Sequence, residues 1–490
     1  MTGLAASGWL ALGCGVSHAA DTTAHFTLQP RAVIDVARDR PGEDVVESWT
    51  WMRATAAGPA RSGRWFLEVQ ADYVVLVGAP DAGDVEAAPN LWMGESGWAG
   101  DLGPVFVRAG HLVDRWGAMD LLPVTDVLNG QDLRAGPLVP IEHARVPAPM
   151  VRIETGQDQL RFGLVALPFG ARSRVPLWGT DYSLVRQGMV EGLVDDAASW
   201  STDPLLAERY RQLFTDLSND LATLDAQTRR GLESALGTAG GPRPLYEAAE
   251  LGLEAQSRLG PVDLAVTGAW LRSRVPAPRI DAGLQQALRD RTLPDTAALT
   301  GSESLVLPSA QSDRPRTWVA GLAAGTLLGS IGLRGETSYT HTAVLSEPWL
   351  DYATTPMWTT GVAIDRAAST RLSALIEGRW RHFTRPPPRA QLVGVPDQME
   401  VAAGLRSTLA RERLTIELGG LYDITFAELA AQPAARFRCS DTLDLGVGAV
   451  VLASPASPAS TWEHLMDYRG GLIGYSSDTD AIWLDMRWLR

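Results

Sequence analysis

The chain has 490 residues, a hydrophobic fraction of 45% and a formal net charge of −14. All 43 of its basic residues are arginine, because the sequence contains no lysine. The acidic balance argues against a nucleic-acid partner, since binding to phosphate backbones requires clustered cations. The missing lysine excludes Schiff-base chemistry and the phosphate-binding lysine of a P-loop.

The first 20 residues are apolar and rich in small side chains, with Leu10-Ala11-Leu12 near the middle. Ser17-His18-Ala19 fits a small-x-small cleavage site, and polar sequence begins at Asp21. This segment resembles a secretory signal peptide, although it lacks the usual positive charge at its start. We therefore expect residues 1–20 to be removed and 21–490 to form the mature protein.

The two cysteines lie far apart, at Cys14 in the leader and at Cys439. Cys14 follows a partial lipobox, so lipidation is the alternative to cleavage after residue 19 or 20. In the cleaved protein Cys439 stands alone, which predicts no disulfide and no thiolate metal site.

Much of the mature chain alternates between apolar and polar side chains, as strands with two different faces do. Within 371–383 the apolar face carries Leu372, Ala374, Ile376, Gly378 and Trp380, and the polar face carries Ser373, Glu377, Arg379 and Arg381. Similar patterns occur in residues 151–164, 250–270, 331–340, 400–418 and 481–490. No later run reaches the roughly 18 apolar residues of a membrane-spanning helix. We predict an all-β fold, a transmembrane antiparallel β-barrel of about 16–18 strands.

Two regions interrupt the strand pattern. Residues 203–230 have apolar side chains at three- and four-residue spacing behind a capping Asp203 and an initial Pro204, which predicts a helix. We expect a helical insertion within 203–240, either a lid or plug of the barrel or a surface helix packed at the base of a loop. Residues 276–315 are polar and rich in turn formers, and we expect a long external loop there.

One segment is more specific than the barrel pattern. Residues 108–134 begin with Arg-x-Gly, continue to Trp-Gly and lead into a stretch rich in Asp, Asn and Pro. The residues that carry this motif are Arg108, Gly110, Trp116, Gly117, Asp120, Pro123, Asp126, Asn129, Asp132 and Arg134. The pattern resembles porin-like β-barrel proteins of Gram-negative outer membranes that have no assigned chemistry. The resemblance implies an outer-membrane barrel with a transport or envelope role and carries over no catalytic residue.

The motif allows two interpretations. Asp, Asn and Pro suit a structural loop folded into the lumen, with Arg108 and Arg134 pairing with loop carboxylates. The alternative is a calcium site built from Asp120, Asp126, Asn129 and Asp132. Their spacing does not fit the alternate-residue ligands of an EF-hand loop, so we predict no metal.

The polar faces of the predicted strands carry charges of both signs. The candidate pore-lining residues are Arg152, Glu154, Arg161, Glu250, Glu254, Arg258, Arg334, Glu336, Glu377, Arg379, Arg381, Arg406, Arg413 and Glu417. They either pair across neighbouring strands and rigidify the wall, or line an aqueous pore and set its selectivity. The mixed signs indicate no ion preference.

We find no arrangement typical of an enzyme. The seven histidines are not paired at metal-ligand spacing, and no Gly-x-Ser-x-Gly turn precedes a helix. His341 and His382 fall on the expected outer wall, where the strand alternation places no serine beside either. We predict no enzymatic activity and no cofactor.

The sequence therefore favours a porin-like outer-membrane channel, or a transporter gated by its helix and its Asp-rich loop, for small solutes. The alternative is a plugged structural or accessory barrel associated with an envelope export system. The expected location is the outer membrane of a Gram-negative bacterium. The expected partners are membrane lipid, lipopolysaccharide and, during biogenesis, the barrel-assembly machinery. The sequence predicts no oligomeric state.

Overall fold

The computed structural model describes residues 22–35, 46–60, 62–77, 86–133, 144–157, 159–171, 173–174, 204–205, 207–208, 211–212, 215, 248–274, 277–279, 286, 290, 311–347, 351–369, 371–385, 397–456, 468, 470–477 and 479–489. The expected signal peptide, residues 1–20, lies outside the described residues. So do most of the expected insertion at 203–240 and most of 276–315.

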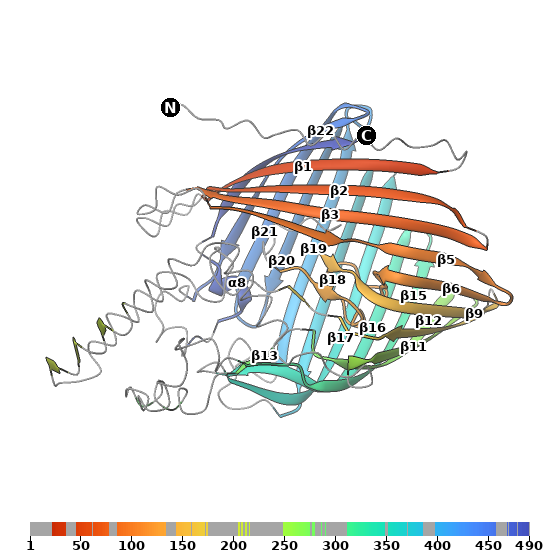
Figure 1. Cartoon of the computed structure of the whole chain (residues 1–490), viewed down its shortest axis with the longest axis horizontal. Helices are drawn as coiled ribbons and strands as arrows, with labels where there is room; N and C mark the ends of the chain where they lie inside the picture. Colours follow the sequence, from red (N-terminus) through yellow and green to blue (C-terminus); the bar gives the residue numbers. More distant parts are fainter. Residues whose placement is uncertain are drawn as a thin grey trace.

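The described residues form a closed antiparallel β-barrel of eighteen strands, as predicted (Figure 1). Its strands are β1 (Thr23–Asp35), β2 (Val46–Ala60), β3 (Gly63–Val77), β4 (Glu86–Met93), β5 (Ser96–Leu102), β6 (Val105–Leu112), β9 (Ala148–Gln157), β10 (Leu160–Leu167), β11 (Glu250–Leu259), β12 (Val262–Arg272), β15 (Arg316–Leu328), β16 (Ile331–Glu347), β17 (Asp351–Ser369), β18 (Leu372–Phe383), β19 (Asp397–Leu409), β20 (Leu414–Asp423), β21 (Glu428–Ser440), β22 (Leu443–Ala453) and β23 (Ala481–Leu489). β4 and β5 are two parts of one barrel strand, interrupted at Gly94 and Glu95, and both pair with β3. Each strand pairs with its neighbours in the chain.

The first and last strands close the barrel. β23, the terminal strand predicted from residues 481–490, pairs with both β22 and β1. Arg31 of β1 and Asp485 of β23 face each other in this register and form a buried ion pair at 3.0 Å. Closure satisfies the backbone groups that an open sheet would leave unpaired at its edges.

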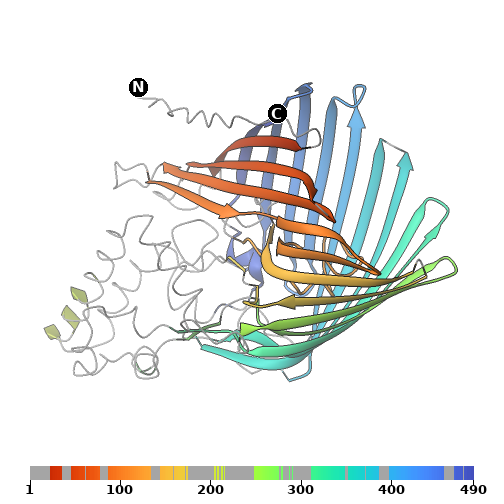
Figure 2. The same cartoon turned by 45° about the vertical axis from the view of Figure 1, so that its right-hand side comes forward.

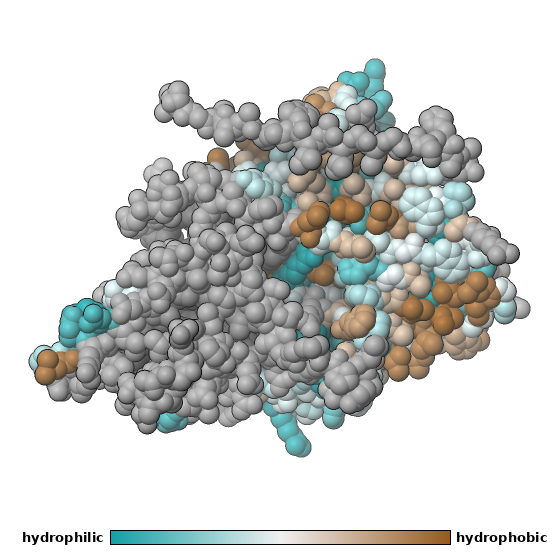
Figure 3. Space-filling view, viewed as in Figure 1, coloured by the Kyte–Doolittle hydropathy of each residue, from teal (hydrophilic) through white to brown (hydrophobic). Residues whose placement is uncertain are grey.

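The barrel wall carries apolar side chains on its outer face and polar side chains on its inner face, the reverse of a water-soluble protein. Apolar side chains point outward and are exposed, as with Ile376 at 58% and Leu253 at 60%, whereas their polar neighbours Glu377 and Glu254 point inward and are buried. Figure 3 shows patches of apolar residues over the strands of the visible wall. The apolar and polar side chains predicted to alternate in 371–383 therefore face the outside and the inside of the barrel.

The two rims of the barrel differ in their connections. At one rim most strands are joined by turns of a few residues, such as Gly260–Pro261 and Gly329–Ser330. The predicted turn at Arg411–Glu412 is there too, with Ala410, Arg411 and Glu412 all at positive φ (50° to 68°). Both ends of the barrel chain, at β1 and β23, lie at this short-turn rim. The strands that flank the longest connections, such as β10, β11, β12 and β15, have those ends at the other rim (Figure 2).

The described parts of the two predicted interruptions are short. Within 203–230 the described residues, 204–205, 207–208, 211–212 and 215, are all helical. Within 276–315 the ends of the segment pair as β13 (Ala277–Arg279) and β14 (Gln311–Asp313), a small ladder that the sequence did not predict. Among the described residues no helix is both long and apolar enough to cross a membrane.

The ion pair at the barrel seam predicts a stability effect. Asp485 accepts from Arg31 and Arg436, both at 3.0 Å, and from Gln29 at 2.9 Å, and its side chain is fully buried. Replacing Asp485 with Ala leaves these donors without their acceptor, so we expect a loss of about 3–5 kcal/mol of unfolding free energy. Urea unfolding in detergent, followed by tryptophan fluorescence, measures it.

The matched control is Asp263→Ala, because Asp263 and Arg258 form an exposed pair at 3.1 Å. Such a pair contributes roughly 0–1 kcal/mol. Equal losses in the two variants would contradict a stabilising role for the seam.

Candidate functional site: the loop inside the barrel

The loop of residues 113–132 (hereafter the inner loop) folds into the barrel. β6 ends at Leu112, and the chain turns inward, crosses in front of β15–β18 and returns to a short ladder of β7 (Gly130–Gln131) and β8 (Arg145–Val146) (Figure 1). Most of the predicted motif lies in this loop. Its side chains Leu122, Val124 and Leu128 are buried against the inner wall.

Two wall carboxylates hold the inner loop by its backbone. Glu336 of β16 accepts from the N–H of Ala118, from the N–H of Met119 at 2.6 Å, and from the N–H and hydroxyl of Thr125 at 3.0 and 2.9 Å. Glu377 of β18 accepts from the N–H groups of the next three residues, Asp120, Leu121 and Leu122, at 2.8, 2.8 and 2.7 Å. The two side chains thereby supply acceptors for six backbone donors that have no strand beside them.

Other wall side chains bind the carbonyl side of the same segment. The Ser338 hydroxyl donates to the Val124 carbonyl at 3.0 Å, and Arg379 donates to the Pro123 carbonyl at 3.2 Å. Arg334 donates to the carbonyl of Ala118 and pairs with Asp120 at 2.7 Å. The wall therefore binds both the N–H groups and the carbonyl groups of the loop.

Glycines of the inner wall leave room for the loop. A Cβ at Gly361 would lie 2.9 Å from a Val124 methyl, and one at Gly252 would lie 2.6 Å from the Trp116 ring. Gly117 itself has φ +89° and lies against Glu336, where a side chain would be both strained and obstructed. This explains the Trp-Gly of the motif: the indole packs on the wall and the glycine turns the chain.

The base of the loop is closed by Asn129 and Asp114. Asn129 accepts from the Asp114 N–H at 2.8 Å and donates to the carbonyls of Leu112 and Val146 at 3.1 and 3.2 Å. The Asp114 carboxylate pairs with Arg152 of β9, which also pairs with Glu254 at 2.9 Å. Burial raises the pKa of Asp114 above its usual value, an effect that Arg152 opposes.

The acidic residues of the motif are held separately. Asp126 pairs with Arg145, Asp132 with Arg174 at 3.3 Å, and Asp120 with Arg334. Burial raises the pKa of Asp126, and its Arg145 partner opposes this effect. Nowhere in the described residues do three potential metal ligands among His, Cys, Asp and Glu gather at one point. Asp120, Asp126 and Asp132 therefore contact three separate arginines.

The arginines that bind these carboxylates are not the two predicted ones, Arg108 and Arg134. Arg108 donates instead to Glu95 at 3.3 Å, because β6 directs it toward the interruption between β4 and β5. Arg134 lies outside the described residues. Arg145, Arg174 and Arg334 take the role, and of these the sequence singled out only Arg334, as a candidate to line a pore.

A second segment also folds into the lumen, from the side opposite the inner loop. Glu428 at the start of β21 is fully buried and accepts from the Gly471 N–H at 2.7 Å. The adjoining short helix α8 (Leu472–Tyr475) places Ile473 against a cluster of Trp49, Trp51 and Trp483. The sequence did not predict this anchor, whose one signal was the glutamate directly before Leu429 and Ala430 at the start of the strand.

The predicted pore-lining residues fall mainly on the inner face of the wall. Arg152, Glu154, Arg161, Glu250, Glu254, Arg258, Arg334, Glu336, Glu377, Arg379, Arg381, Arg406 and Glu417 alternate with the apolar outer residues. Arg413 is an exception, because it belongs to the turn between β19 and β20. Glu336 and Glu377 lie beneath the inner loop and Glu250 binds Arg274, so these three are buried anchors. Glu400, which the sequence reading did not include, pairs with Arg379 and Arg381 at 2.7 and 2.9 Å.

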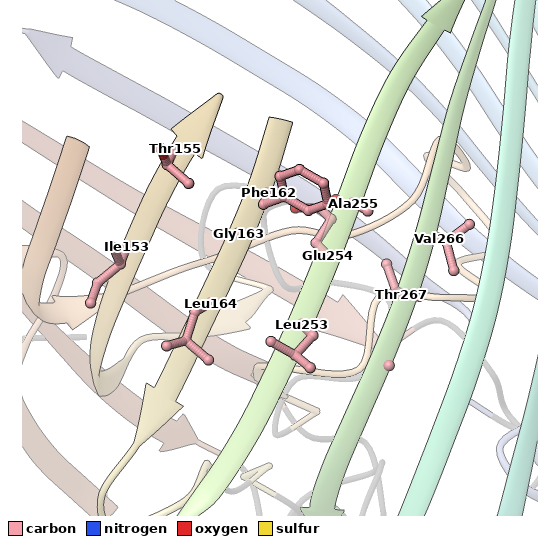
Figure 4. Close-up of a pocket in the computed structure, with 11 residues that line it drawn as sticks. Ile153, Thr155, Phe162, Gly163, Leu164, Leu253, Glu254, Ala255, Val266 and Thr267 are labelled. Atoms are coloured by element: carbon pink, nitrogen blue, oxygen red, sulfur yellow. The ribbon is translucent and has the colours of Figure 1, made fainter. Parts of the chain in front are cut away.

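The outer wall carries a shallow groove of about 430 Å³ over β9–β12 (Figure 4). Phe162, Leu164, Leu253 and Val266 form its apolar surface. Because these side chains point away from the lumen, the groove is separate from the inner loop.

His341 and His382 belong to a row of aromatic side chains on the outer wall. His341 stacks on Trp318 at 5.3 Å, and His382 stacks on Trp380 at 5.6 Å and contacts Asp397 at 2.9 Å. Within the described part of the chain, the contacts of these two histidines are with aromatic rings and, for His382, with Asp397.

No family model and no curated protein matches this chain. Among solved structures, it is similar to OccK7 (OpdD) of Pseudomonas aeruginosa, with a TM-score of 0.46 and 10% identity, covering 96% of this chain and 99% of that one. It is also similar to OccAB3 of Acinetobacter baumannii (TM-score 0.45, 6% identity, 96% and 99% covered) and to OmpF of Salmonella typhi in complex with daunomycin (0.37, 7%, 96% and 97%). These scores are below 0.5 and do not identify a family.

The two anchors predict a selective pattern of amide exchange in the inner loop. In Glu377→Ala we expect the amides of residues 120–122 to exchange roughly ten- to a hundredfold faster, because hydrogen bonds to a charged group contribute about 1.5–3 kcal/mol. The amides of 118, 119 and 125 should change in the same way in Glu336→Ala. Hydrogen exchange read by NMR or mass spectrometry checks both.

The control is Glu417→Ala, which removes an exposed wall glutamate that pairs with Arg406. It should leave all six amides protected. Uniform acceleration in the three variants would show that the loop is not held by these two carboxylates.

Proposed function

We propose that the protein is a porin-like channel of a Gram-negative outer membrane, and that the inner loop narrows its lumen for small solutes. The observation that carries the proposal is the inner loop itself, fixed by Glu336 and Glu377 inside a closed barrel. Barrels of 16–18 strands enclose an aqueous channel unless something fills it. A loop bound to one side of the wall reduces the cross-section of the lumen without spanning all of it.

The outer wall supports a membrane location. Its apolar side chains are exposed and its backbone groups are paired around the closed sheet, as a lipid environment requires. Trp270, Trp318, Trp358 and Trp380 project from the outer wall toward the ends of their strands at the long-loop rim. Aromatic side chains of this kind form girdles at membrane interfaces.

The rims support one orientation. Transmembrane barrels of bacteria have short periplasmic turns and longer extracellular loops. The short-turn rim, with both ends of the barrel chain, therefore faces the periplasm, and the connections that include 168–249 and 273–315 face the cell exterior. Lipid and lipopolysaccharide then contact the outer wall.

One observation favours the alternative of a plugged structural or accessory barrel. The inner loop and the segment around Gly471 enter the lumen from opposite sides, so the two together reduce it more than either alone. The helical region at 203–230 adds a further candidate plug. Electrical conductance separates the two functions, since a plugged barrel passes no steady current.

The test is single-channel conductance of the mature protein in a planar bilayer. We expect steady current in the parent and a larger or fluctuating current in the Glu336→Ala, Glu377→Ala double variant, because the loop loses its backbone acceptors and leaves the wall. A variant lacking residues 203–230 shows whether that helix limits the current.

The outcomes separate the proposals. Current only in the deletion variant would make the helix a plug and the protein a gated transporter. Silence in all three proteins, with folding confirmed by circular dichroism, would exclude a channel and leave the structural or accessory role. Arg366→Ala serves as the control that should conduct like the parent, because Arg366 lies on the outer face with Val362 and Ile364.

A further inference from the structure

We propose that Arg274 is a positioning residue of the inner loop, and that it ties the return half of the loop, residues 126–132, to the bases of the two long connections that leave β10 and β12. A displacement at either base then moves the return half and changes the width of the lumen. The inference deepens the proposed channel function and rests on it only for the effect on current.

Arg274 lies just after β12 and binds two other parts of the chain at once. Its Nε donates to the Val127 carbonyl of the inner loop at 2.8 Å, and its Nη1 donates to the Ala171 carbonyl at 3.2 Å. Nη1 also pairs at 2.5 Å with Glu250, whose side chain is fully buried. Ala171 and Glu250 lie at the two ends of the connection between β10 and β11. One guanidinium group therefore joins the base of that connection to the inner loop.

Hydrogen bonds of neighbouring residues continue this junction. The Gln131 N–H donates to the Ser173 hydroxyl at 3.0 Å, and the Arg174 N–H donates to the Gln131 carbonyl at 2.8 Å. The Ser173 N–H donates in turn to the Arg274 carbonyl at 2.9 Å. Arg174 also pairs with Asp132 at 3.3 Å. The end of the inner loop is therefore bonded to the start of the first connection, and that segment is bonded to the start of the second.

The two halves of the inner loop are held from different parts of the barrel. Glu336 and Glu377 fix residues 118–125 to β16 and β18 on the wall. The return half pairs instead with β8 and with the connection bases, and Val127 packs against the buried cluster that includes Ala171. The return half can therefore shift with the bases while the first half stays on the wall.

The bond between Arg274 and Val127 is strong enough to position the loop. A hydrogen bond donated by a charged group is roughly twice as strong as one between neutral groups. The Arg274 side chain is 14% exposed, so water competes little for its donors. The Val127 carbonyl is therefore held at the connection base, and the adjoining residues of the return half follow it.

Arg314 offers a matched comparison because it lies in the same cluster. It precedes β15, its Nε donates to the Ser273 carbonyl at 2.7 Å, and its Nη2 donates to the Ala171 carbonyl. Glu250 lies 3.9 Å from it. Within the described residues these contacts join the connection bases to one another. Of the two Nε bonds, the one from Arg274 reaches the inner loop.

The test replaces arginine with lysine, which keeps the positive charge but has a methylene in place of Nε. In Arg274→Lys we expect the amides of Gln131 and Asp132 to exchange roughly tenfold faster, because the return half loses its bond to Nε. The amides of 120–122 should keep their parent rates, since Glu377 still accepts from them. Hydrogen exchange read by NMR in detergent measures both groups of amides.

The matched control is Arg314→Lys, which loses the equivalent Nε bond to a carbonyl outside the inner loop. It should leave the Gln131 and Asp132 amides at their parent rates. Equal acceleration in the two variants would overturn the inference. Acceleration of the amides of 120–122 in Arg274→Lys would overturn it too, because the whole barrel would then have loosened.

Single-channel recording of the same proteins separates the inference from the channel itself. We expect additional current levels in Arg274→Lys and a single level in the parent and in Arg314→Lys. A steady current with protected Gln131 and Asp132 amides in Arg274→Lys would overturn this inference and leave the channel. The predicted exchange with an unchanged current would overturn the link to lumen width. Silent barrels with the predicted exchange would overturn the channel and keep the positioning role.

Discussion

The inner loop is held in place by side-chain carboxylates that accept hydrogen bonds from its backbone N–H groups. A chain segment inside a barrel has no neighbouring strand, so its N–H groups need partners from side chains or water. Glu336 and Glu377 supply those partners for six consecutive or nearly consecutive residues. Each carboxylate has two oxygens and negative charge, so one side chain replaces several bonds of a strand ladder. The conformation of the loop follows from this constraint.

The remaining features of the inner wall fit around that interaction. Glycines at 252 and 361 bring the loop close enough to pack Trp116 and Val124 on the wall. Arg334 and Arg379, beside the two anchors, bind carbonyls of the same segment. The anchors and these arginines come from β16 and β18, so the loop is fixed to one side of the lumen.

The fold could be predicted from the sequence because alternation is a local property. Ile376 and Glu377 are adjacent in the chain and fall on opposite faces of the wall, as their side chains indicate. The strand number and the terminal strand at 481–489 were readable for the same reason, whereas the loop was predicted from its Asp, Asn and Pro residues. Closure followed from the need to pair both edges of the sheet.

The roles of the charged residues were not predictable in the same way. Glu336 looks like Glu417 in sequence, since both alternate with apolar residues on a strand, yet Glu336 is buried beneath a loop more than two hundred residues away in the chain. Arg108 lies within the motif but reaches Glu95, and Arg145, Arg174 and Arg334 bind the motif carboxylates instead. Alternation gives the face of a side chain, whereas its exposure depends on which distant segment covers that face.

The central claim is that the inner loop lies on the ion path. It is tested most directly by placing a cysteine at Asp120, whose side chain is 63% exposed, in a Cys439→Ser background. A charged thiol reagent is then added during single-channel recording. The account predicts a stepwise change of current in Asp120→Cys and none in Ile376→Cys on the outer wall. An unchanged current after confirmed modification of Asp120→Cys would contradict it.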